Sequence, residues 1–381
     1  MKHGLENQVH ANLSHIAPNR PPCGFTLISR DKRPKSIRTR KKTEVRSMSK
    51  IKNMKDLADL AGVTTGTVSR ALADSSLISA KTRERIQALA LEHGFRPNVV
   101  ARNLRTQKTG AIGVLIPLGH ETGQHISDPF FITMLGHLAD ELTERGYDLL
   151  LSRVIPEDSN WLDRYIGSGK TDGLIIIGQS DQAATLDRVA KDYLPLVVWG
   201  GHNPDQVHCS VGSDNIRGGE IAATHLIERG CERIAFFGDP RALEIGQRLE
   251  GCKRAMERAG LADKLTMFPA HLVAEAAGPD IARYLGSVGE RPQGIVAASD
   301  VIAMTALRAL SEFGLAVPGD VHVIGYDGLE IGEHTVPRLS TISQDLKAGA
   351  AHMVDLLLRR IAGEHTNSVV MEPKLVVRMS S

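Results

Sequence analysis

The stretch that decides the fold of the N-terminal part reads MKDLADLAGVTTGTVSRAL and spans residues 54–72. Apolar residues recur in its first half at the three- and four-residue spacing of an amphipathic helix. These residues are Met54, Leu57, Ala58 and Ala61. Gly62 permits a sharp turn, and Thr64 has the hydroxyl side chain that commonly N-caps a helix, here one running to about Leu72. The stretch therefore predicts two short helices joined by a tight turn, a helix-turn-helix.

The second predicted helix presents polar residues on its outer faces. In a helix-turn-helix, the first residues of this helix meet base edges in the major groove, and arginine is the commonest reader of guanine. The candidate DNA-contacting residues are Thr64, Thr65, Gly66, Thr67, Ser69 and Arg70. Ser79 is placed to cap a third helix over about 80–93, which Gly94 ends. Such three-helix modules also occur in proteins that bind no DNA, so this spacing alone leaves both possibilities open.

The next segment favours DNA binding. Residues 95–105 read FRPNVVARNLR and predict a helix, beginning near Asn98, that is too short to be stable alone. DNA could stabilise it, with Arg102 and Arg105 near phosphates and Leu104 wedged between base steps in the minor groove. We expect residues 50–97 to form the DNA-binding domain and residues 98–109 to form a hinge helix and linker.

Charge is distributed unevenly along the chain. Residues 1–109 contain 22 Lys and Arg against 8 Asp and Glu, whereas residues 110–381 contain 24 against 36. A basic N-terminal part followed by an acidic remainder is typical of a nucleic-acid-binding domain joined to a second domain. Residues 1–49 show no amphipathic period and are predicted to be disordered, the alternative being a basic arm that contacts phosphates. A start at Met48 or Met54 would omit nearly all of this segment.

From residue 110 onward, short apolar runs alternate with helical segments. The predicted strands are 111–117, 147–153, 172–178, 196–201, 233–239, 265–270, 294–300 and 321–328. The predicted helices lie near 130–145, 215–229, 244–259, 279–286 and 301–313. Continuous apolar strands between helices indicate parallel sheets covered on both faces, and their number favours two doubly wound subdomains. In such folds, ligands bind beyond the carboxyl ends of the strands.

Several function classes find no support in the sequence. The four cysteines are scattered, with no spacing typical of a zinc site or a disulfide framework, so we expect no metal. No GxGxxG follows a strand, and neither a Walker A nor a GxSxG motif is present, so we expect neither an enzyme nor a cofactor. The apolar runs are strand-length and residues 1–47 lack a signal-peptide core, which predicts a cytoplasmic protein without a membrane helix.

The chain resembles the LacI/GalR family of bacterial transcription regulators. The resemblance begins with the helix-turn-helix stretch and covers roughly residues 50–381. Its further motifs are GVLIP (113–117), SDNIRGG (213–219), RLEGCKRAM (248–256), AASDVIAMTAL (297–307), VIGYDG (323–328) and LSTISQD (339–345). The resemblance implies a periplasmic-binding-protein-like sensor over 110–381 whose two subdomains are joined by three crossovers. The expected subdomains are about 110–212 with 344–362, and about 213–340 with 365–381.

Residues near the strand ends supply candidate effector contacts. Asp128 could accept hydrogen bonds from sugar hydroxyls or only N-cap the next helix, and Phe130 could stack on a pyranose ring or belong to the core. Trp199 ends a strand and could serve as a platform for a ring. Further candidates at a strand end and on the last crossover are Ser299, Asp300 and Gln344.

The resemblance implies two further effector-binding residues, and the chain departs from the family's pattern at two positions. Arg248 matches the family's effector-binding arginine, whose guanidinium can grip two hydroxyls or a carboxylate, and Asp327 matches a second effector residue. A buried salt bridge is the alternative role for this pair. Gly200 stands where the family often has Asp, and Gly66 stands where it usually has a side chain that reads bases.

The implied function is a transcriptional regulator, expected to repress carbohydrate-utilisation genes. It would bind pseudo-palindromic operator DNA as a homodimer and be controlled by a small sugar bound between the subdomains. A purine or another non-sugar effector is the alternative within the family. A free sugar-binding protein is the remote alternative, because it would not carry the DNA-binding residues.

Overall fold

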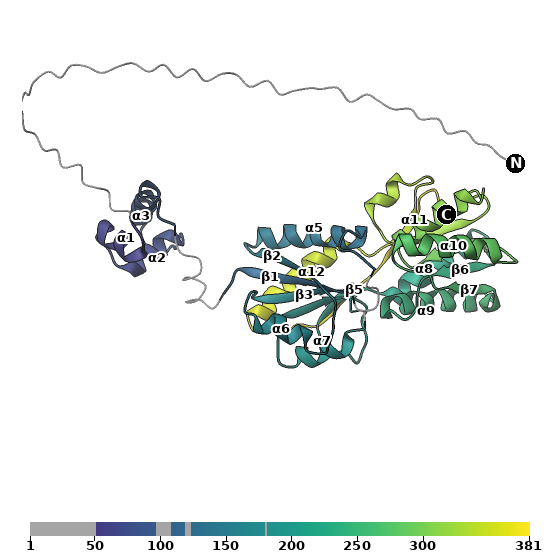
Figure 1. The fold of residues 1–381 in the computed structure, drawn as a ribbon, viewed down its shortest axis with the longest axis horizontal. Coiled ribbons are helices and arrows are strands. Elements are labelled where there is room, and N and C mark those ends of the chain that lie inside the picture. Colours follow the sequence, from purple (N-terminus) through teal and green to yellow (C-terminus); the bar gives the residue numbers. More distant parts are fainter. Residues whose placement is uncertain (1–50, 97–107, 119–122, 180) are drawn as a thin grey trace, which may run out of the picture. The chain divides into compact units, whose positions relative to one another are not determined.

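The computed structural model describes residues 51–96, 108–118, 123–179 and 181–381 (Figure 1). The chain forms two compact units that divide between Arg96 and Pro97. We call the described part of the first the helical unit and that of the second the α/β unit. The basic segment 1–49 and most of the predicted hinge, including Asn98, Arg102, Leu104 and Arg105, lie outside the described residues.

The helical unit confirms the predicted helix-turn-helix. Its helices are α1 (Met54–Ala61), α2 (Thr65–Leu72) and α3 (Ala80–Glu92). Gly62 adopts a left-handed φ of 64° at the turn, and the Thr64 and Ser79 side chains accept hydrogen bonds from backbone N–H groups at the starts of α2 and α3. The apolar faces of the helices meet in a small core whose buried members are Leu57, Ala58, Ala61, Val68, Ala71, Ile86 and Ala90.

The α/β unit contains two six-stranded sheets within the described residues. The first has the order β11-β5-β4-β3-β1-β2, with every pair parallel. Its strands are β1 (Ala111–Pro117), β2 (Asp148–Val154), β3 (Gly173–Ile177), β4 (Leu196–Trp199), β5 (Ser210–Ser213) and β11 (Val369–Met371). Its helices are α5 (Pro129–Glu144), α6 (Trp161–Gly167), α7 (Ala183–Ala190) and α12 (Leu346–Ile361).

The second sheet has the order β12-β10-β9-β8-β6-β7 and is parallel except for the pair β10–β12. Its strands are β6 (Ile234–Phe237), β7 (Leu265–Phe268), β8 (Gly294–Ala297), β9 (His322–Asp327), β10 (Ser340–Ser343) and β12 (Lys374–Val376). Its helices are α8 (Asn215–Glu228), α9 (Leu243–Arg258), α10 (Ala274–Ser287), α11 (Asp300–Glu312) and the 3₁₀ turns η1 (Ala262–Lys264) and η2 (Glu330–His334). The predicted fold class, two doubly wound subdomains after a helix-turn-helix, is confirmed.

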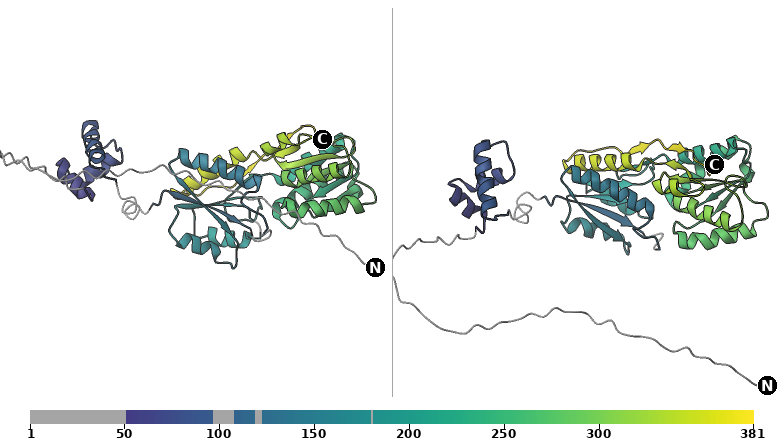
Figure 2. Two further views of the ribbon diagram at one scale, coloured as in Figure 1. Left: turned by 45° about the horizontal axis from the view of Figure 1, so that its top comes forward. Right: turned by 90° about the horizontal axis from the view of Figure 1, so that it is seen from above.

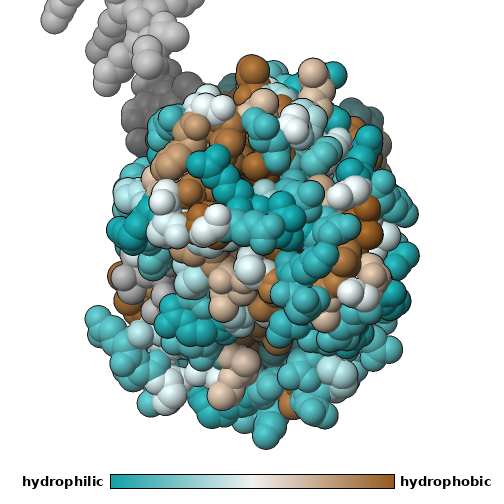
Figure 3. Space-filling model, turned by 90° about the vertical axis from the view of Figure 1, so that its right-hand side faces the viewer, coloured by the Kyte–Doolittle hydropathy of each residue, from teal (hydrophilic) through white to brown (hydrophobic). Residues whose placement is uncertain are grey.

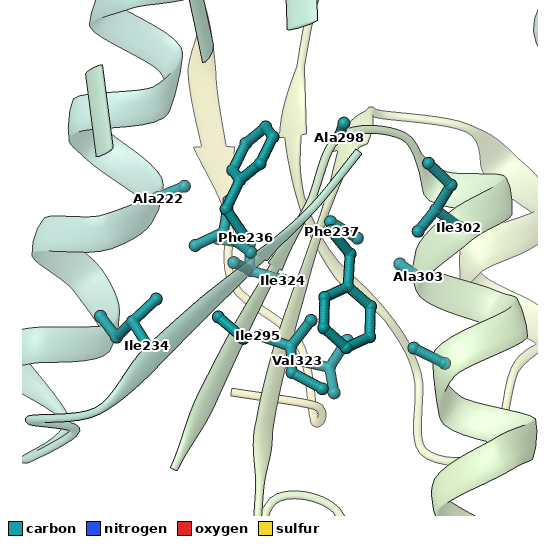
Figure 4. Packing of buried hydrophobic residues seen from close by; sticks show 14 of the residues in the cluster. Ala222, Ile234, Phe236, Phe237, Ile295, Ala298, Ile302, Ala303, Val323 and Ile324 are labelled. Atoms are coloured by element: carbon teal, nitrogen blue, oxygen red, sulfur yellow. The ribbon is translucent and has the colours of Figure 1, made fainter. Parts of the chain in front are cut away.

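Helices cover both faces of each sheet, which explains why the strands are continuously apolar (Figures 1 and 2). In β1, Val114 faces the core that includes α5 and α12, whereas the next residue, Leu115, faces the core of α6 and α7. Figure 4 shows the same alternation in β6, where Phe236 points toward α8 and Phe237 points toward α11. Successive side chains of β1 and β6 are therefore buried on opposite faces of their sheets, whereas the edge strands β2 and β7 are largely exposed or half-buried.

Topology corrects one predicted boundary. We expected residues 365–381 to belong to the second subdomain, but β11 pairs with β5 of the first sheet, and only the following β12 joins the second. The chain therefore crosses between the subdomains near residues 213–215, 343–346 and 371–374, which confirms the three crossovers. The predicted helix near 279–286 begins earlier, at Ala274, and contains Pro279.

The surface of the second subdomain is mainly hydrophilic where Figure 3 shows it, with apolar residues in small separate patches. Within the described ranges, no helix combines the length and the apolar character needed to cross a bilayer. The same residues contain no group of three or more His, Cys, Asp or Glu side chains placed to hold a metal ion.

Core packing in the first subdomain can be tested on α5. Leu138 is fully buried in the core that contains Trp199, so Leu138→Ala is expected to lower the free energy of unfolding by about 2–5 kcal/mol. Ile132, on the same helix, is 53% exposed, and Ile132→Ala is expected to cost less than about 1 kcal/mol. Urea unfolding followed by tryptophan fluorescence measures both, because both tryptophans lie in this subdomain. Equal losses would contradict the packing described.

Candidate DNA-binding face and effector cleft

The outer side of α2 is the candidate DNA-binding face. Val68 and Ala71 anchor the helix in the core, which leaves the opposite side of α2 accessible. Thr64, Thr65, Gly66 and Arg70 are exposed, and Thr67 and Ser69 are half-buried. The Thr64 and Thr67 hydroxyls lie 3.0 Å apart, so both are engaged at the start of the helix. Of the exposed side chains on this face, those of Thr65 and Arg70 are therefore the best placed to reach bases.

Gly66 lies in open space on this face. A Cβ built there would contact only the Thr64 hydroxyl, at 3.7 Å. Nothing in the helical unit therefore requires glycine at this position for steric reasons. Since glycine costs about 1 kcal/mol of helix propensity relative to alanine, the helix carries this cost without a gain in packing.

A cleft of about 860 Å³, part of it open to solvent, lies between the subdomains of the α/β unit. Seven of the eight predicted effector residues line it: Asp128, Phe130, Trp199, Arg248, Ser299, Asp327 and Gln344. They come from chain segments more than 200 residues apart. Parallel strands bring them together, because the carboxyl ends of both sheets face the same gap.

The first subdomain contributes aromatic rings and one carboxylate to the cleft. The ring centroids of Phe130 and Trp199 lie 6.5 Å apart and are tilted by 45°. Asp128 N-caps α5 by accepting a hydrogen bond from the Phe130 N–H at 2.9 Å, and it also accepts one from Gln124 at 3.1 Å. Burial raises the pKa of Asp128, while these two hydrogen bonds oppose the rise. Asp128 is thus both a cap and a cleft residue, and the two readings of it do not exclude each other.

The second subdomain contributes a buried guanidinium. Arg248 is 7% exposed and donates through Nε to Asn215 Oδ1 at 2.8 Å and through Nη1 to the Ala298 carbonyl. Its Cζ lies 3.7 Å from the centroid of the Tyr326 ring, and its Nη1 lies 4.0 Å from Asp327 Oδ1. At 4.0 Å, the pair with Asp327 is loose, so both predicted roles of Arg248, ion pairing and ligand contact, fit this geometry.

Close packing of two helices sets the position of Arg248. A Cβ on Gly219 of α8 would collide with the Arg248 carbonyl, and one on Gly251 of α9 would collide with the Ile216 carbonyl. The glycines of the motifs SDNIRGG and RLEG therefore let the two backbones approach. This approach brings Asn215, at the start of α8, within hydrogen-bonding distance of the guanidinium.

Asp327 links the cleft to the crossovers. Gln344 donates to Asp327 Oδ1 at 2.8 Å, and Ser213 donates to Gln344 Oε1 at 2.9 Å. Ser213 and Gln344 lie on two different crossovers, so Asp327 is linked to one crossover directly through Gln344 and to the other through Gln344 and Ser213. Burial raises the pKa of Asp327 well above its ordinary value; the Arg248 guanidinium opposes this rise, and the Asp300 and Asp128 carboxyls add to it.

The position of Asp300 contradicts the prediction that this residue contacts the effector. It is fully buried and does not line the cleft. Its carboxylate accepts hydrogen bonds from the Thr341 hydroxyl at 2.6 Å and from the Leu329 N–H at 2.8 Å. Ser299 faces the cleft, but the next residue of a helix points about 100° away, here into the interior. Asp300 therefore supports the cleft wall instead of contacting an effector.

Sequence reasoning missed several cleft residues, among them Gln124, Ser213, Asn215, Glu244 and Leu272. The motif SDNIRGG, which contains Ser213 and Asn215, was a usable signal because it is one of the motifs that carry the family resemblance, although the strand β5 at whose last residue it begins was not predicted. Glu244 lies four residues before Arg248, one helical turn away, which was a second signal. Gln124 and Leu272 lie in loops, and nothing in the sequence around them indicated that they line the cleft.

Comparison with known proteins identifies the family. The model for bacterial regulatory proteins of the lacI family matches residues 53–98, and that for a periplasmic binding protein-like domain matches residues 223–381. The HTH-type transcriptional regulator CelR of Thermobifida fusca is 32% identical over 335 residues, which cover 85% of this chain and 96% of that protein. The chain belongs to the LacI family.

Other LacI-family members match over nearly the whole length. The HTH-type transcriptional repressor PurR of Aliivibrio salmonicida is 28% identical over 338 residues, 86% of this chain and 98% of that protein. A CelR–cellobiose complex superimposes with a TM-score of 0.60 at 28% identity, covering 87% of this chain and all of that one. A structure of the lac repressor dimer bound to operator and the anti-inducer ONPF superimposes with a TM-score of 0.74 at 25% identity, covering 86% of this chain and 98% of that one.

The buried carboxyls of this LacI-family chain predict a pH dependence of stability. Burial raises the pKa of Asp300 to about 7 from an ordinary value of 3.8. Between about pH 4 and pH 7 Asp300 therefore holds a proton in the folded protein that it releases in the unfolded chain, so its contribution to stability falls as pH rises through this window. Asp327, whose pKa is also raised, acts in the same direction.

Asp300→Asn is expected to flatten this decline, because asparagine does not titrate. It should also lower stability throughout by about 1–3 kcal/mol, because its amide cannot accept from both Thr341 and Leu329. Urea midpoints measured by circular dichroism between pH 4 and 7.5 test both effects, with the exposed Asp263→Asn as the control. An unchanged pH slope in Asp300→Asn would contradict the assignment.

Proposed function

We propose that this LacI-family regulator is a repressor whose binding to operator DNA, as a homodimer, is controlled by a small carbohydrate held in the cleft between its subdomains. One observation carries the proposal: the same cleft is lined by two aromatic rings, those of Phe130 and Trp199, and by the polar side chains of Arg248 and of the hydrogen-bonded pair Asp327 and Gln344. A pyranose has apolar faces and a rim of hydroxyls, and this cleft offers partners for both.

The segment that leads to the helical unit is anchored to the first subdomain. Thr109 and Gly110 donate backbone hydrogen bonds to the two carboxylate oxygens of Asp172, at 2.6 and 2.9 Å, just before β1 begins. Movement of the first subdomain around a ligand would therefore move the end of this segment. A ligand that prefers one arrangement of the subdomains then shifts the population that binds DNA.

The relatives support this proposal and also indicate the alternative. CelR is described in complex with cellobiose, whereas other relatives bear the name PurR. An aromatic pair with an arginine and carboxylates also suits a purine. A thermal-shift screen of mono- and disaccharides, with purines as the comparison set, distinguishes the two, because a ligand of the folded state raises the melting temperature with its concentration. Stabilisation by purines alone would overturn the carbohydrate assignment and keep the regulator.

Base reading by α2 can be tested at Arg70. Arg70→Ala is expected to cost about 1–3 kcal/mol in binding to the preferred sequence and much less in binding to scrambled DNA. Lys81→Ala removes the same charge from an exposed position on α3, outside the candidate recognition helix, and serves as the control. Sequences selected from random DNA provide the probe, and fluorescence anisotropy gives both affinities. An equal loss on both DNAs would assign Arg70 to phosphate contact.

The effector role of Arg248 is tested by separating sensing from DNA binding. Arg248→Ala is expected to abolish the response of DNA binding to the stabilising sugar while leaving binding of ligand-free protein within about threefold of normal, since its contacts lie in the α/β unit. Arg254→Ala, an exposed arginine on the same helix, is the control. Loss of DNA binding itself in Arg248→Ala would show that the residue is required for folding.

A further inference from the structure

The charged groups that line the effector cleft are mostly negative. Among the lining residues in the described part of the chain, carboxylates come from Asp128, Glu244 and Asp327, and Arg248 is the one cation. The other polar lining side chains are uncharged and include Gln124, Ser213, Asn215, Ser299 and Gln344. The cleft therefore offers many acceptors for hydroxyl or ammonium donors, and few positive groups for an anion.

The positive charge of Arg248 is partly engaged within the protein. Two of its five N–H donors are directed to Asn215 and the Ala298 carbonyl, its plane covers Tyr326, and Asp327 lies 4.0 Å away. A phosphate needs strong donors and contributes only acceptors. To bind at Arg248, it would have to compete with Asp327 for the same cation, in a site where like charges are poorly screened.

Glu244 brings negative charge to the opposite wall because the facing residues are glycines. Its Oε1 accepts a hydrogen bond from the Gly201 N–H at 2.9 Å. A Cβ on Gly200 would lie 2.8 Å from the same oxygen and 2.5 Å from Gln179 Nε2. The space that a side chain at position 200 would need is thus occupied by Gln179 of the same subdomain and by Glu244 from across the cleft, and the wall keeps a carboxylate although residue 200 supplies none.

We infer that the effector of this cleft is an uncharged or amine-bearing sugar and that phosphorylated and acidic sugars are rejected. This inference rests on the proposed carbohydrate effector and narrows it to one chemical class. The charge balance that supports it does not depend on the ionisation of the two buried aspartates. With Asp128 and Asp327 both protonated, Glu244 still offsets Arg248, and the lining residues that the structure describes supply no further positive charge for an anionic ligand.

Matched sugars test the inference on the full chain. The probes are glucose, glucosamine, glucose 6-phosphate and glucuronate, the corresponding galactose series, and cellobiose with its 6-phosphate. Isothermal titration calorimetry near neutral pH is expected to show binding by a neutral or amino member. Its phosphate and uronate counterparts should bind at least about tenfold more weakly.

Glu244→Gln isolates the effect of charge, because a glutamine oxygen can still accept from Gly201. In this variant the preference for the neutral over the phosphorylated sugar is expected to shrink by about tenfold. Glu250→Gln makes the same charge change on the exposed side of α9, where Glu250 pairs with Arg254, and should leave the preference unchanged.

The failures are distinguishable. A phosphate ester that binds as tightly as its neutral parent, or a preference unchanged by Glu244→Gln, would overturn this inference while the carbohydrate effector stands. If no sugar of any charge binds and a purine does, the carbohydrate proposal fails and the inference falls with it. If Glu250→Gln changes the preference as much as Glu244→Gln does, the effect is a general one of protein charge and the role of Glu244 is refuted.

Discussion

The buried guanidinium of Arg248 organises the polar wall of the cleft. A cation in such a place is stable only if its donors are satisfied and negative charge lies nearby. Asn215, the Ala298 carbonyl and Asp327 meet these needs, and they belong to α8, the end of β8 and the end of β9. Three elements of the second subdomain must therefore be in place together before the charge is compensated, which makes the wall preorganised for a ligand.

The crossovers extend this arrangement to the first subdomain. Ser213 ends β5 of the first sheet, yet its hydroxyl lies 3.3 Å from that of Tyr326, beneath Arg248, and donates to Gln344. A second contact, the Lys374–Asp345 ion pair at 3.8 Å, joins the second and third crossovers at the surface. The connections between the subdomains are thus held partly by side chains that line the cleft, Ser213 and Gln344 among them, so a ligand in the cleft and a movement of the subdomains would involve the same contacts.

Local signals predicted much of the structure, and tertiary contacts explain what they missed. Thr64 and Ser79 were identifiable because a cap acts within its own turn, and Trp199 and Asp327 because strand ends converge. β5 and β10 read SVGS and STIS; such short polar runs carry no periodic signal and become strands only by pairing. The place of Glu244 depends on the space above Gly200, which no spacing within α9 reveals. β11 has three residues, too few to indicate which sheet it joins.

The return of α12 and β11 to the first sheet also bears on the order of events during synthesis. The core of the first subdomain includes buried residues of α12, which leave the ribosome only after every strand of the second sheet except β12, so its packing has to wait for them. The core of the helical unit lies within residues 57–90 and its contacts are local, a property of fast-folding units. A nascent chain therefore possesses its helix-turn-helix well before it possesses a cleft.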